Sequence, residues 1–150
     1  MATVSQATTG TQLNDVRSLM RAFLAWHRER HVEDLALIDN YFDEEEWEHE
    51  LAELPGKYGP PKGSLLVAYH DERPAGCVAL RNLGDGACEM KRMFVPTKFR
   101  GLRIGGALAD RIIADARTAG YRLMRLDTSR RQAEAMRLYR GSVGSRRTIR

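Results

Sequence analysis

The sequence has few cysteines, few histidines and no long apolar run, and each shortage excludes a class of protein. Its two cysteines, Cys77 and Cys88, are too few for a disulfide framework and lack the partners of a zinc motif. We therefore expect both to be buried, reduced thiols. The four histidines lack metal-ligand spacing, so no metal site is expected. The longest apolar stretches, such as residues 65–68, are far below the ~20 residues of a membrane-spanning helix, and no membrane partner is expected.

The chain also lacks a targeting signal and an internal domain boundary. Residues 1–12 carry neither the basic segment nor the apolar core of a secretory signal, so we expect a cytoplasmic location. With 43% hydrophobic and 29% charged residues, the composition is typical of a soluble globular protein. A length of 150 residues without repeats predicts a single domain over residues 1–150.

Charge is divided unevenly along the chain, although the net charge is only +4. Residues 1–90 carry 8 basic and 16 acidic side chains, whereas residues 91–150 carry 16 basic and 4 acidic ones. A polyanion would therefore bind to the second half, and either a nucleic acid or the phosphates of a cofactor fits that charge. The sequence has no nucleic-acid recognition motif, so we expect no nucleic-acid partner.

Apolar spacing and turn residues predict the order α-α-β-β-β-α-β-α. Three prolines and three glycines within residues 55–63 mark a loop between the first helices and the first strands. Ser129 and Gln132 form a capping-box pattern that predicts a final helix. The predicted elements are helices over 15–27 and 31–54, strands over 64–69, 75–81 and 87–95, a helix from Ile104 to a C-terminal cap at Gly120, a strand over 121–127 and a helix over 129–140.

A strand, a glycine-rich turn and a helix follow one another over residues 93–108, MFVPTKFRGLRIGGAL. This arrangement binds phosphate, because backbone N–H groups and the helix N-terminus point at the anion. The turn lacks the Lys-Ser/Thr pair of a P-loop and the GxGxxG pattern of a dinucleotide fold. The sequence therefore predicts a site for a different phosphate-bearing ligand.

The segment Arg-Gly-x-x-Ile-Gly-x-Ala-Leu over residues 100–108 resembles the coenzyme A signature of GNAT acetyltransferases. Leu-Asp-Thr at 126–128 and Ala-Met-Arg-Leu-Tyr at 135–139 extend the resemblance, so that its core motifs cover residues 64–140. It implies an α/β (α+β) fold, in which helices flank a mixed, mostly antiparallel central sheet. It also implies acetyl-CoA as cosubstrate, without a metal.

In this family the glycine-rich turn holds the pyrophosphate of coenzyme A, mainly through backbone amides. The last residues of the preceding strand pair their backbone with the pantetheine arm. One position departs from the pattern, because Arg103 stands where the family usually has glycine. The resemblance assigns the cofactor contacts to Met93, Phe94, Val95, Arg100, Gly101, Leu102, Arg103, Ile104, Gly105 and Gly106.

Transfer of acetyl from a thioester to an amine needs a neutral amine and a proton for the departing thiolate. The resemblance makes Tyr139 the candidate acid, since the family's Leu-Tyr tyrosine lies near the sulfur; the alternative role is a packing anchor. Glu89 is the candidate base, or else a solvated or ion-paired side chain. Strand alternation places Glu89, Lys91 and Met93 on one face and Met90, Arg92 and Phe94 on the other. The acidic run 43–53 either attracts a cationic amine or forms a solvated helix face.

The last residues depart from the resemblance. In the family the Leu-Tyr helix precedes a Gly-Phe element and two strands, whereas here residues 141–150 form an atypical basic tail. We expect these strands to be missing through a truncation or frame change near residue 144, which would open a strand edge and favour a homodimer. The alternative is that the tail is an ordinary variable end. The predicted function is an N-acetyltransferase acting on a small-molecule or peptide amine; the alternative is a weak or inactive acyl-CoA-binding remnant.

Overall fold

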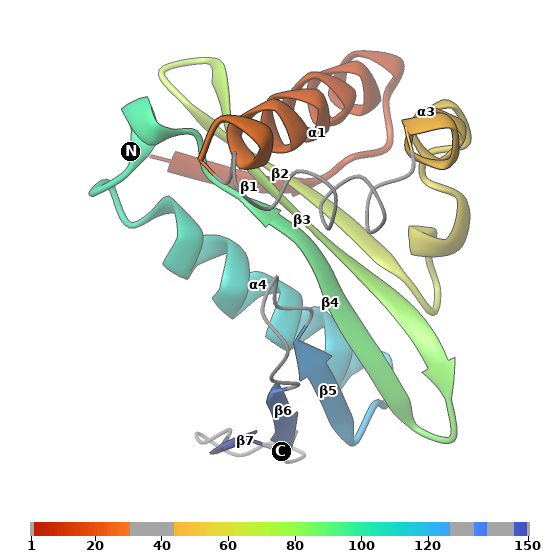
Figure 1. The fold of residues 1–150 in the computed structure, drawn as a ribbon. Helices are drawn as coiled ribbons and strands as arrows, with labels where there is room; N and C mark the ends of the chain where they lie inside the picture. The colour runs from red at the N-terminus through yellow and green to blue at the C-terminus, as the bar shows by residue number, and fades with distance from the viewer. Residues whose placement is uncertain (1, 31–43, 127–133, 138–145, 150) are drawn as a thin grey trace.

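A single seven-stranded sheet forms the centre of the computed structural model, which describes residues 2–30, 44–126, 134–137 and 146–149 (Figure 1). Its strands lie in sequence order and pair antiparallel, except that β4 and β5 are parallel. The predicted mixed, mostly antiparallel sheet is therefore confirmed. The strands are β1 (Ala2–Gln6), β2 (Ser64–His70), β3 (Arg73–Gly84), β4 (Ala87–Phe94), β5 (Leu123–Leu126), β6 (Glu134–Arg137) and β7 (Arg146–Ile149).

Helices cover both faces of this sheet and create two apolar cores. One core lies under α1 (Gly10–Arg30), α3 (Glu44–Ala52) and the short 3₁₀ helix η2 (Gly56–Tyr58). The other lies under α4 (Ile104–Thr118), on the opposite face (Figure 1). The alternation of β2 supplies both, because Leu65 faces the first core and Leu66 the second. Cys77 and Cys88 are buried free thiols, as predicted, and burial raises the pKa of each to about 12.

The first helix begins five residues earlier than predicted, because Thr9 and Gln12 form a capping box at its N-terminus. The Gln12 amide donates to Thr9 Oγ1 at 3.1 Å, and the Thr9 amide donates to Gln12 Oε1 at 3.1 Å. The preceding β1 was not predicted either, since its mostly polar residues give little apolar alternation. Of the second predicted helix, only α3 falls within the described residues. At the end of α4, Gly120 adopts φ +93°, consistent with its predicted capping role.

The predicted helix over 129–140 is wrong for residues 134–137, which form β6. These residues pair antiparallel with β5, from Leu123 opposite Arg137 to Leu126 opposite Glu134. The backbone groups of β5 offer a ladder of hydrogen bonds, and such tertiary pairing overrides a weak local helix preference. A further strand, β7, pairs with β6. Two strands thus follow β5 in the described residues, whereas the sequence analysis expected the C-terminal strands to be missing.

A β-bulge interrupts β4 at Arg92. Ala79 of β3 pairs with Lys91 and Cys77 with Phe94, so β4 has two residues, Arg92 and Met93, where β3 has one. Arg92 takes φ +59°, and its carbonyl lies 3.4 Å from the Cys77 thiol, which donates to it.

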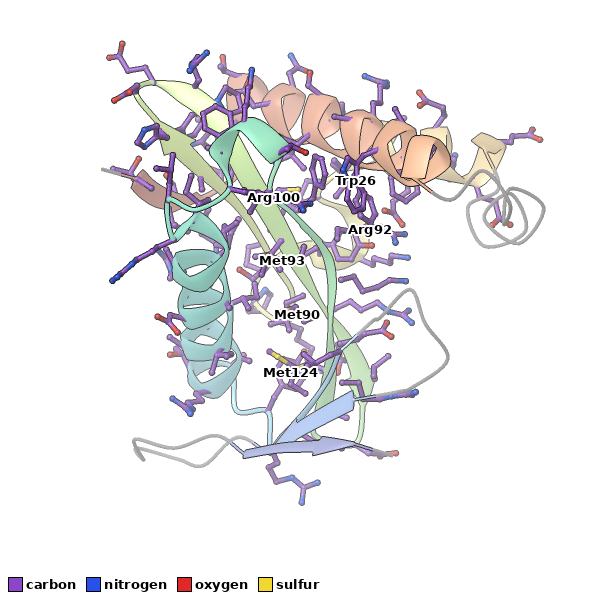
Figure 2. The ribbon with its side chains drawn as sticks, turned by 60° about the vertical axis from the view of Figure 1, so that its left-hand side comes forward. Trp26, Met90, Arg92, Met93, Arg100 and Met124 are labelled. Carbon is purple, nitrogen blue, oxygen red and sulfur yellow. The ribbon has the colours of Figure 1, made fainter. Side chains whose placement is uncertain are left out.

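The extra residue reverses the alternation beyond it. Met93 therefore packs on the α4 core with Met90 and not on the face of Glu89, and Phe94 belongs to the α1 core and not to the face of Met90, so both predictions are wrong; Arg92 and Phe94 share a face as predicted. Figure 2 shows Met90 and Met93 on the side of α4 and Arg92 pointing away from it.

Candidate functional site

The glycine-rich turn forms a pocket of about 370 Å³ at the N-terminus of α4. Most residues predicted to hold the cofactor through this turn meet there. Leu102 and Gly106 do not line the pocket, and Leu102 is 45% exposed. The lining residues are Val95, Phe99, Arg100, Gly101, Arg103, Ile104 and Gly105.

The backbone of this pocket suits an anion. The Ala107 amide donates to the Arg103 carbonyl at 3.1 Å, which closes the first turn of α4. The amides of residues 104–106 precede this bond, and helix geometry leaves such N–H groups without an intrahelical partner. Arg103, the N-cap, makes no side-chain capping bond. The N–H groups and the positive end of the helix dipole are thus available to a phosphate.

Arg103 has a left-handed backbone, with φ +64°. This conformation explains why glycine is usual at this position of the signature, because a Cβ makes it unfavourable by about 1 kcal/mol.

We expect Arg103→Gly to raise the free energy of unfolding by about 1 kcal/mol in a urea titration. Ala107→Gly, in the interior of the same helix, is the control and should lower it by about 0.5–1 kcal/mol. If both variants lose stability, the left-handed backbone at Arg103 is not strained.

The Arg100 side chain is directed to α1 as well as to the turn. Its Nε donates to the Val95 carbonyl at 3.2 Å, and its guanidinium lies 4.9 Å from the centre of the Trp26 ring (Figure 2). Arg100 therefore joins the turn to the first helix. Removing it would disturb packing as well as any ligand contact.

Beyond Met90, β4 has no paired neighbour on its β5 side within the described residues. The parallel pairing of β4 with β5 runs from Ala87 opposite Leu123 to Met90 opposite Leu126 and stops there. Within the described residues, no strand pairs with that edge of β4 over 91–94. The backbone groups of Met93, Phe94 and Val95 therefore lie between the paired part of β4 and the glycine-rich turn, where the sequence analysis expects the pantetheine arm.

Of the two predicted catalytic residues, only Glu89 lies within the described structure. Glu89 accepts a hydrogen bond from Arg81 Nε of β3 at 2.7 Å and forms an ion pair with it, which the sequence analysis did not predict. It lies in the part of β4 that pairs with β5, opposite Arg125. Tyr139 lies outside the described residues.

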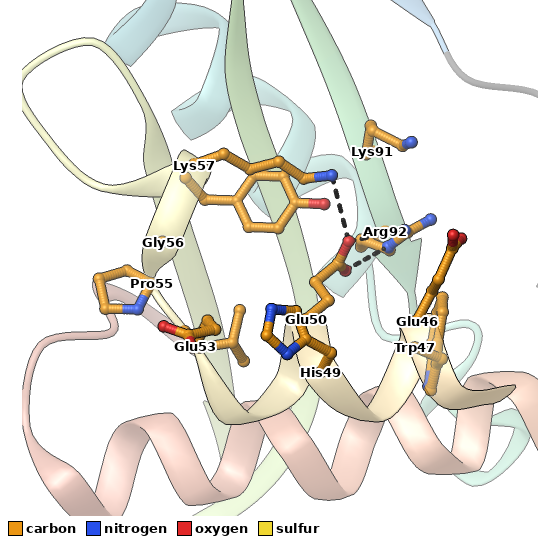
Figure 3. Close-up of a pocket in the computed structure, with 12 residues that line it drawn as sticks. Glu46, Trp47, His49, Glu50, Glu53, Pro55, Gly56, Lys57, Lys91 and Arg92 are labelled. Carbon is orange, nitrogen blue, oxygen red and sulfur yellow. Dashed lines mark hydrogen bonds and ion pairs between the residues drawn. The ribbon is translucent and has the colours of Figure 1, made fainter. Parts of the chain in front are cut away.

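A second pocket, of about 430 Å³, lies on the other side of the bulge, between α3, η2 and β4 (Figure 3). The sequence analysis assigned none of its residues individually. Its lining combines acids, bases and aromatic groups: Glu46, Trp47, His49, Glu50, Glu53, Leu54, Pro55, Gly56, Lys57, Tyr58, Lys91 and Arg92.

A buried ion pair crosses this pocket from α3 to the bulge. Arg92 donates from Nε and Nη2 to the two carboxylate oxygens of Glu50, at 2.9 and 3.0 Å. Lys57 Nζ lies 3.3 Å from Glu50, and the Arg92 guanidinium lies 4.5 Å from the Trp47 ring centre. Burial acts to raise the pKa of Glu50, but the hydrogen bonds and charges of Arg92 and Lys57 outweigh it and lower that pKa. Glu50 is therefore held as a carboxylate.

Tyr58 places a polar atom in the same pocket. The residue has no exposed surface, and its hydroxyl lies near the Glu50 carboxylate without reaching hydrogen-bond geometry with any residue that the structure describes. Burial raises the pKa of Tyr58 far above its ordinary value, and the nearby Glu50 carboxylate adds to the effect, although Arg92 opposes it. The hydroxyl thus remains a neutral hydrogen-bond donor.

The sequence contained a signal for this pocket. Within the acidic run, Glu46, Glu50 and Glu53 recur at intervals of four and three, which places them on one face of a helix. Glu48 instead faces solvent, paired at 2.9 Å with Arg21 of α1. The solvated face is therefore found at Glu48, whereas attraction of a cationic amine stays a prediction.

The described residues contain neither a metal-binding cluster nor a membrane-spanning helix. In that part of the chain, no group of three or more His, Cys, Asp or Glu side chains is placed to hold a metal ion. Among the helices described, none combines the length and the apolar character needed to cross a membrane.

The described structure thus combines a β4 that pairs with β5 only as far as Met90, a turn after β4 suited to an anion, and a second pocket across the bulge, which together suit a phosphate-bearing ligand beside a second molecule. The profile of the acetyltransferase (GNAT) family matches residues 26–144. The chain therefore belongs to that family of N-acetyltransferases.

Comparisons with individual proteins agree with this assignment. The chain is 45% identical over 93 residues to an uncharacterised N-acetyltransferase of Schizosaccharomyces pombe, covering 61% of this chain and 57% of that protein. It is 40% identical over 81 residues to the IAA acetyltransferase of Azospirillum brasilense, covering 53% of each. The match thus spans little more than half the length of these relatives.

Solved structures share the fold at low sequence identity. The PaiA N-acetyltransferase of Thermoplasma acidophilum, in complex with coenzyme A, superposes with a TM-score of 0.62 at 16% identity, covering 87% of this chain and 81% of that one. An aminoglycoside 6′-N-acetyltransferase complexed with coenzyme A gives a TM-score of 0.61 at 16% identity, covering 84% and 61%.

Proposed function

We propose that the chain transfers the acetyl group of acetyl-CoA to a primary amine of a small molecule or peptide, by direct attack in a ternary complex. The observation that carries the proposal is that two pockets adjoin one short segment of β4. The pocket at the glycine-rich turn includes Val95, and the pocket beside α3 includes Lys91 and Arg92. Three residues of extended chain rise about 10 Å, so a ligand extended along this segment reaches from one pocket to the other.

The turn residues fit the phosphates of coenzyme A. A Cβ built on Gly105 would have only the Val95 side chain within 4 Å, at 3.8 Å, and one built on Gly106 would meet nothing, so the approach to the helix amides is open. Gly101, Arg103 and Gly105 would hold the pyrophosphate, and the free edge over Met93–Val95 would hold the pantetheine arm. The bound acetyl-CoA supplies an activated thioester.

The chain's own residues would manage the protons. We propose Glu89 as the base that takes a proton from the ammonium, directly or through water, and Tyr139 as the acid for the departing thiolate. Glu50 is a poorer base, because two cations, Arg92 and Lys57, engage its carboxylate, whereas the described ion pair of Glu89 is with Arg81 alone. Its role is to position the bulge at the meeting point of the two pockets.

Calorimetry with acetyl-CoA, followed by thiol-release assays on a panel of amines, tests this function. At 100 times its dissociation constant, the ligand should raise the free energy of unfolding by about 2.7 kcal/mol. Release of free thiol should depend on the amine. Binding without turnover of any amine would favour the inactive acyl-CoA-binding remnant, and the absence of binding would refute both.

A further inference from the structure

We propose that the pocket between α3, η2 and β4 takes an acceptor that carries a carboxylate near its amine, such as a free amino acid or a short peptide. The inference rests on the proposed acetyl transfer and specifies the acceptor. The pocket's volume of about 430 Å³ lies in the lower part of the range of small-ligand pockets, about 300–1,000 Å³.

The charged side chains of this pocket are divided between facing elements. Glu46 and Glu50 come from α3 and Glu53 from the turn that follows it, whereas the cations Lys57, Lys91 and Arg92 come from η2 and β4. Figure 3 shows Glu46 beside Trp47 and Arg92, with Lys57 across the Glu50 carboxylate. Three acids and three bases suit a ligand that carries both signs. A polyamine would be repelled by the cations, and a pure anion by the acids.

The least exposed charges in the pocket already satisfy each other. The side chains of Arg92 and Glu50 are 9% and 15% exposed, and they form the two-point ion pair described above. Lys57, 46% exposed, shares the Glu50 carboxylate and retains further N–H donors for a ligand. The carboxylate of the acceptor would therefore bind on the side of η2 and β4, and its ammonium on the side of α3.

The Tyr58 hydroxyl independently marks a ligand position. It belongs to a fully buried residue that lines the pocket, and it lies near the Glu50 carboxylate without reaching hydrogen-bond geometry with any described residue. A buried polar group left unpaired costs about 1–3 kcal/mol, so such groups in native proteins normally have a partner. The Lys57 ammonium lies 5.4 Å from the centre of the Tyr58 ring. A neutral donor beside a cation fits a carboxylate and disfavours an ammonium.

Matched pairs of acceptors test the inference with the full chain. Tyrosine and tyramine, histidine and histamine, and lysine and cadaverine differ within each pair only by the carboxylate. Calorimetry in the presence of coenzyme A measures their binding, and thiol release from acetyl-CoA measures turnover. We expect an amino acid to bind at least about ten-fold more tightly than its decarboxylated partner, the equivalent of one charge-assisted hydrogen bond.

Two variants assign that preference to the pocket. Tyr58→Phe keeps the buried ring and removes only the donor, and Lys57→Met removes the cation. Each should reduce the preference for the amino acid about ten-fold by weakening its binding, with little change in the binding of the amine. Lys62→Met, an exposed lysine in the same loop and outside the pocket lining, should leave the preference unchanged.

The outcomes separate this inference from the proposed function. Equal or tighter binding of the decarboxylated partners, or no binding of any member of the pairs, would overturn the inference even if another amine is acetylated. Carboxylate-dependent binding without thiol release would support the inference and overturn the proposed transfer.

Discussion

Gly105→Glu is expected to weaken acetyl-CoA binding by at least about 100-fold while leaving the chain folded. Gly105 lines the pocket at the N-terminus of α4, where the pyrophosphate is expected. At an effective dielectric constant of about 20, two unit charges 4 Å apart repel by about 4 kcal/mol, and about 2.7 kcal/mol already corresponds to 100-fold in affinity. Isothermal calorimetry with acetyl-CoA measures the loss.

The fold should tolerate this substitution for two reasons. The nearest atom to an added Cβ is Val95 Cγ2, at 3.8 Å, which is ordinary van der Waals contact. An acidic residue in the first turn of a helix also stabilises it by about 0.3–1 kcal/mol through the helix dipole. The denaturation midpoint should therefore stay constant or rise slightly. Loss of binding together with a large fall in the midpoint would indicate unfolding instead.

Gly10→Glu is the matched control. Gly10 also begins a helix, α1, and a Cβ there would meet nothing within 4 Å, but the residue lies outside both pockets. The same charge at a helix N-terminus should leave the affinity for acetyl-CoA unchanged. An unchanged affinity in Gly105→Glu as well would place the phosphates elsewhere and refute the assignment of the turn.

The glycine-rich turn was predictable because its chemistry is local in sequence. Residues 100–106 provide the glycines, the turn and the helix start within seven positions, and the pocket forms where that pattern predicts. Even the departure from the family pattern is explained locally, since Arg103 occupies the left-handed conformation that glycine favours.

The second pocket was not predictable in the same way, because it depends on contacts between distant segments. Glu50 and Arg92 are 42 positions apart, and nothing in either neighbourhood indicates the pairing. The bulge at Arg92 also reverses the strand alternation, so a period-two reading assigned Met93 and Phe94 to the wrong faces. The helix prediction for residues 134–137 failed for a related reason, because their strand depends on pairing with the edge of β5.

The largest expected effect on stability belongs to Arg92→Met. The substitution leaves the Glu50 carboxylate, 15% exposed, without the bidentate partner that compensates its burial. Removing one member of a buried ion pair typically costs about 3–5 kcal/mol, and urea denaturation at neutral pH measures it. The matched control is Arg21→Met, which breaks the exposed pair of Arg21 with Glu48 on the same helix α3. This control should hardly move the midpoint, because exposed pairs contribute little.

A second substitution and a pH series attribute the loss to the pair. Removing both charges, in Arg92→Met with Glu50→Leu, should restore much of the stability that Arg92→Met loses, because no unpaired charge remains.

The pH series tests the charge of Glu50, because Arg92 and Lys57 lower its pKa in the folded chain. A group whose pKa is lowered by folding adds to the free energy of unfolding above its ordinary pKa, about 4.3 for glutamate, and that contribution is lost as the pH falls through the folded value. The deficit of Glu50→Gln relative to the parent chain should therefore be full at pH 7 and shrink below about pH 4. A deficit that does not change between pH 7 and pH 3 would mean that the side chain acts through packing alone, and the ion pair would not be what holds α3 against the bulge.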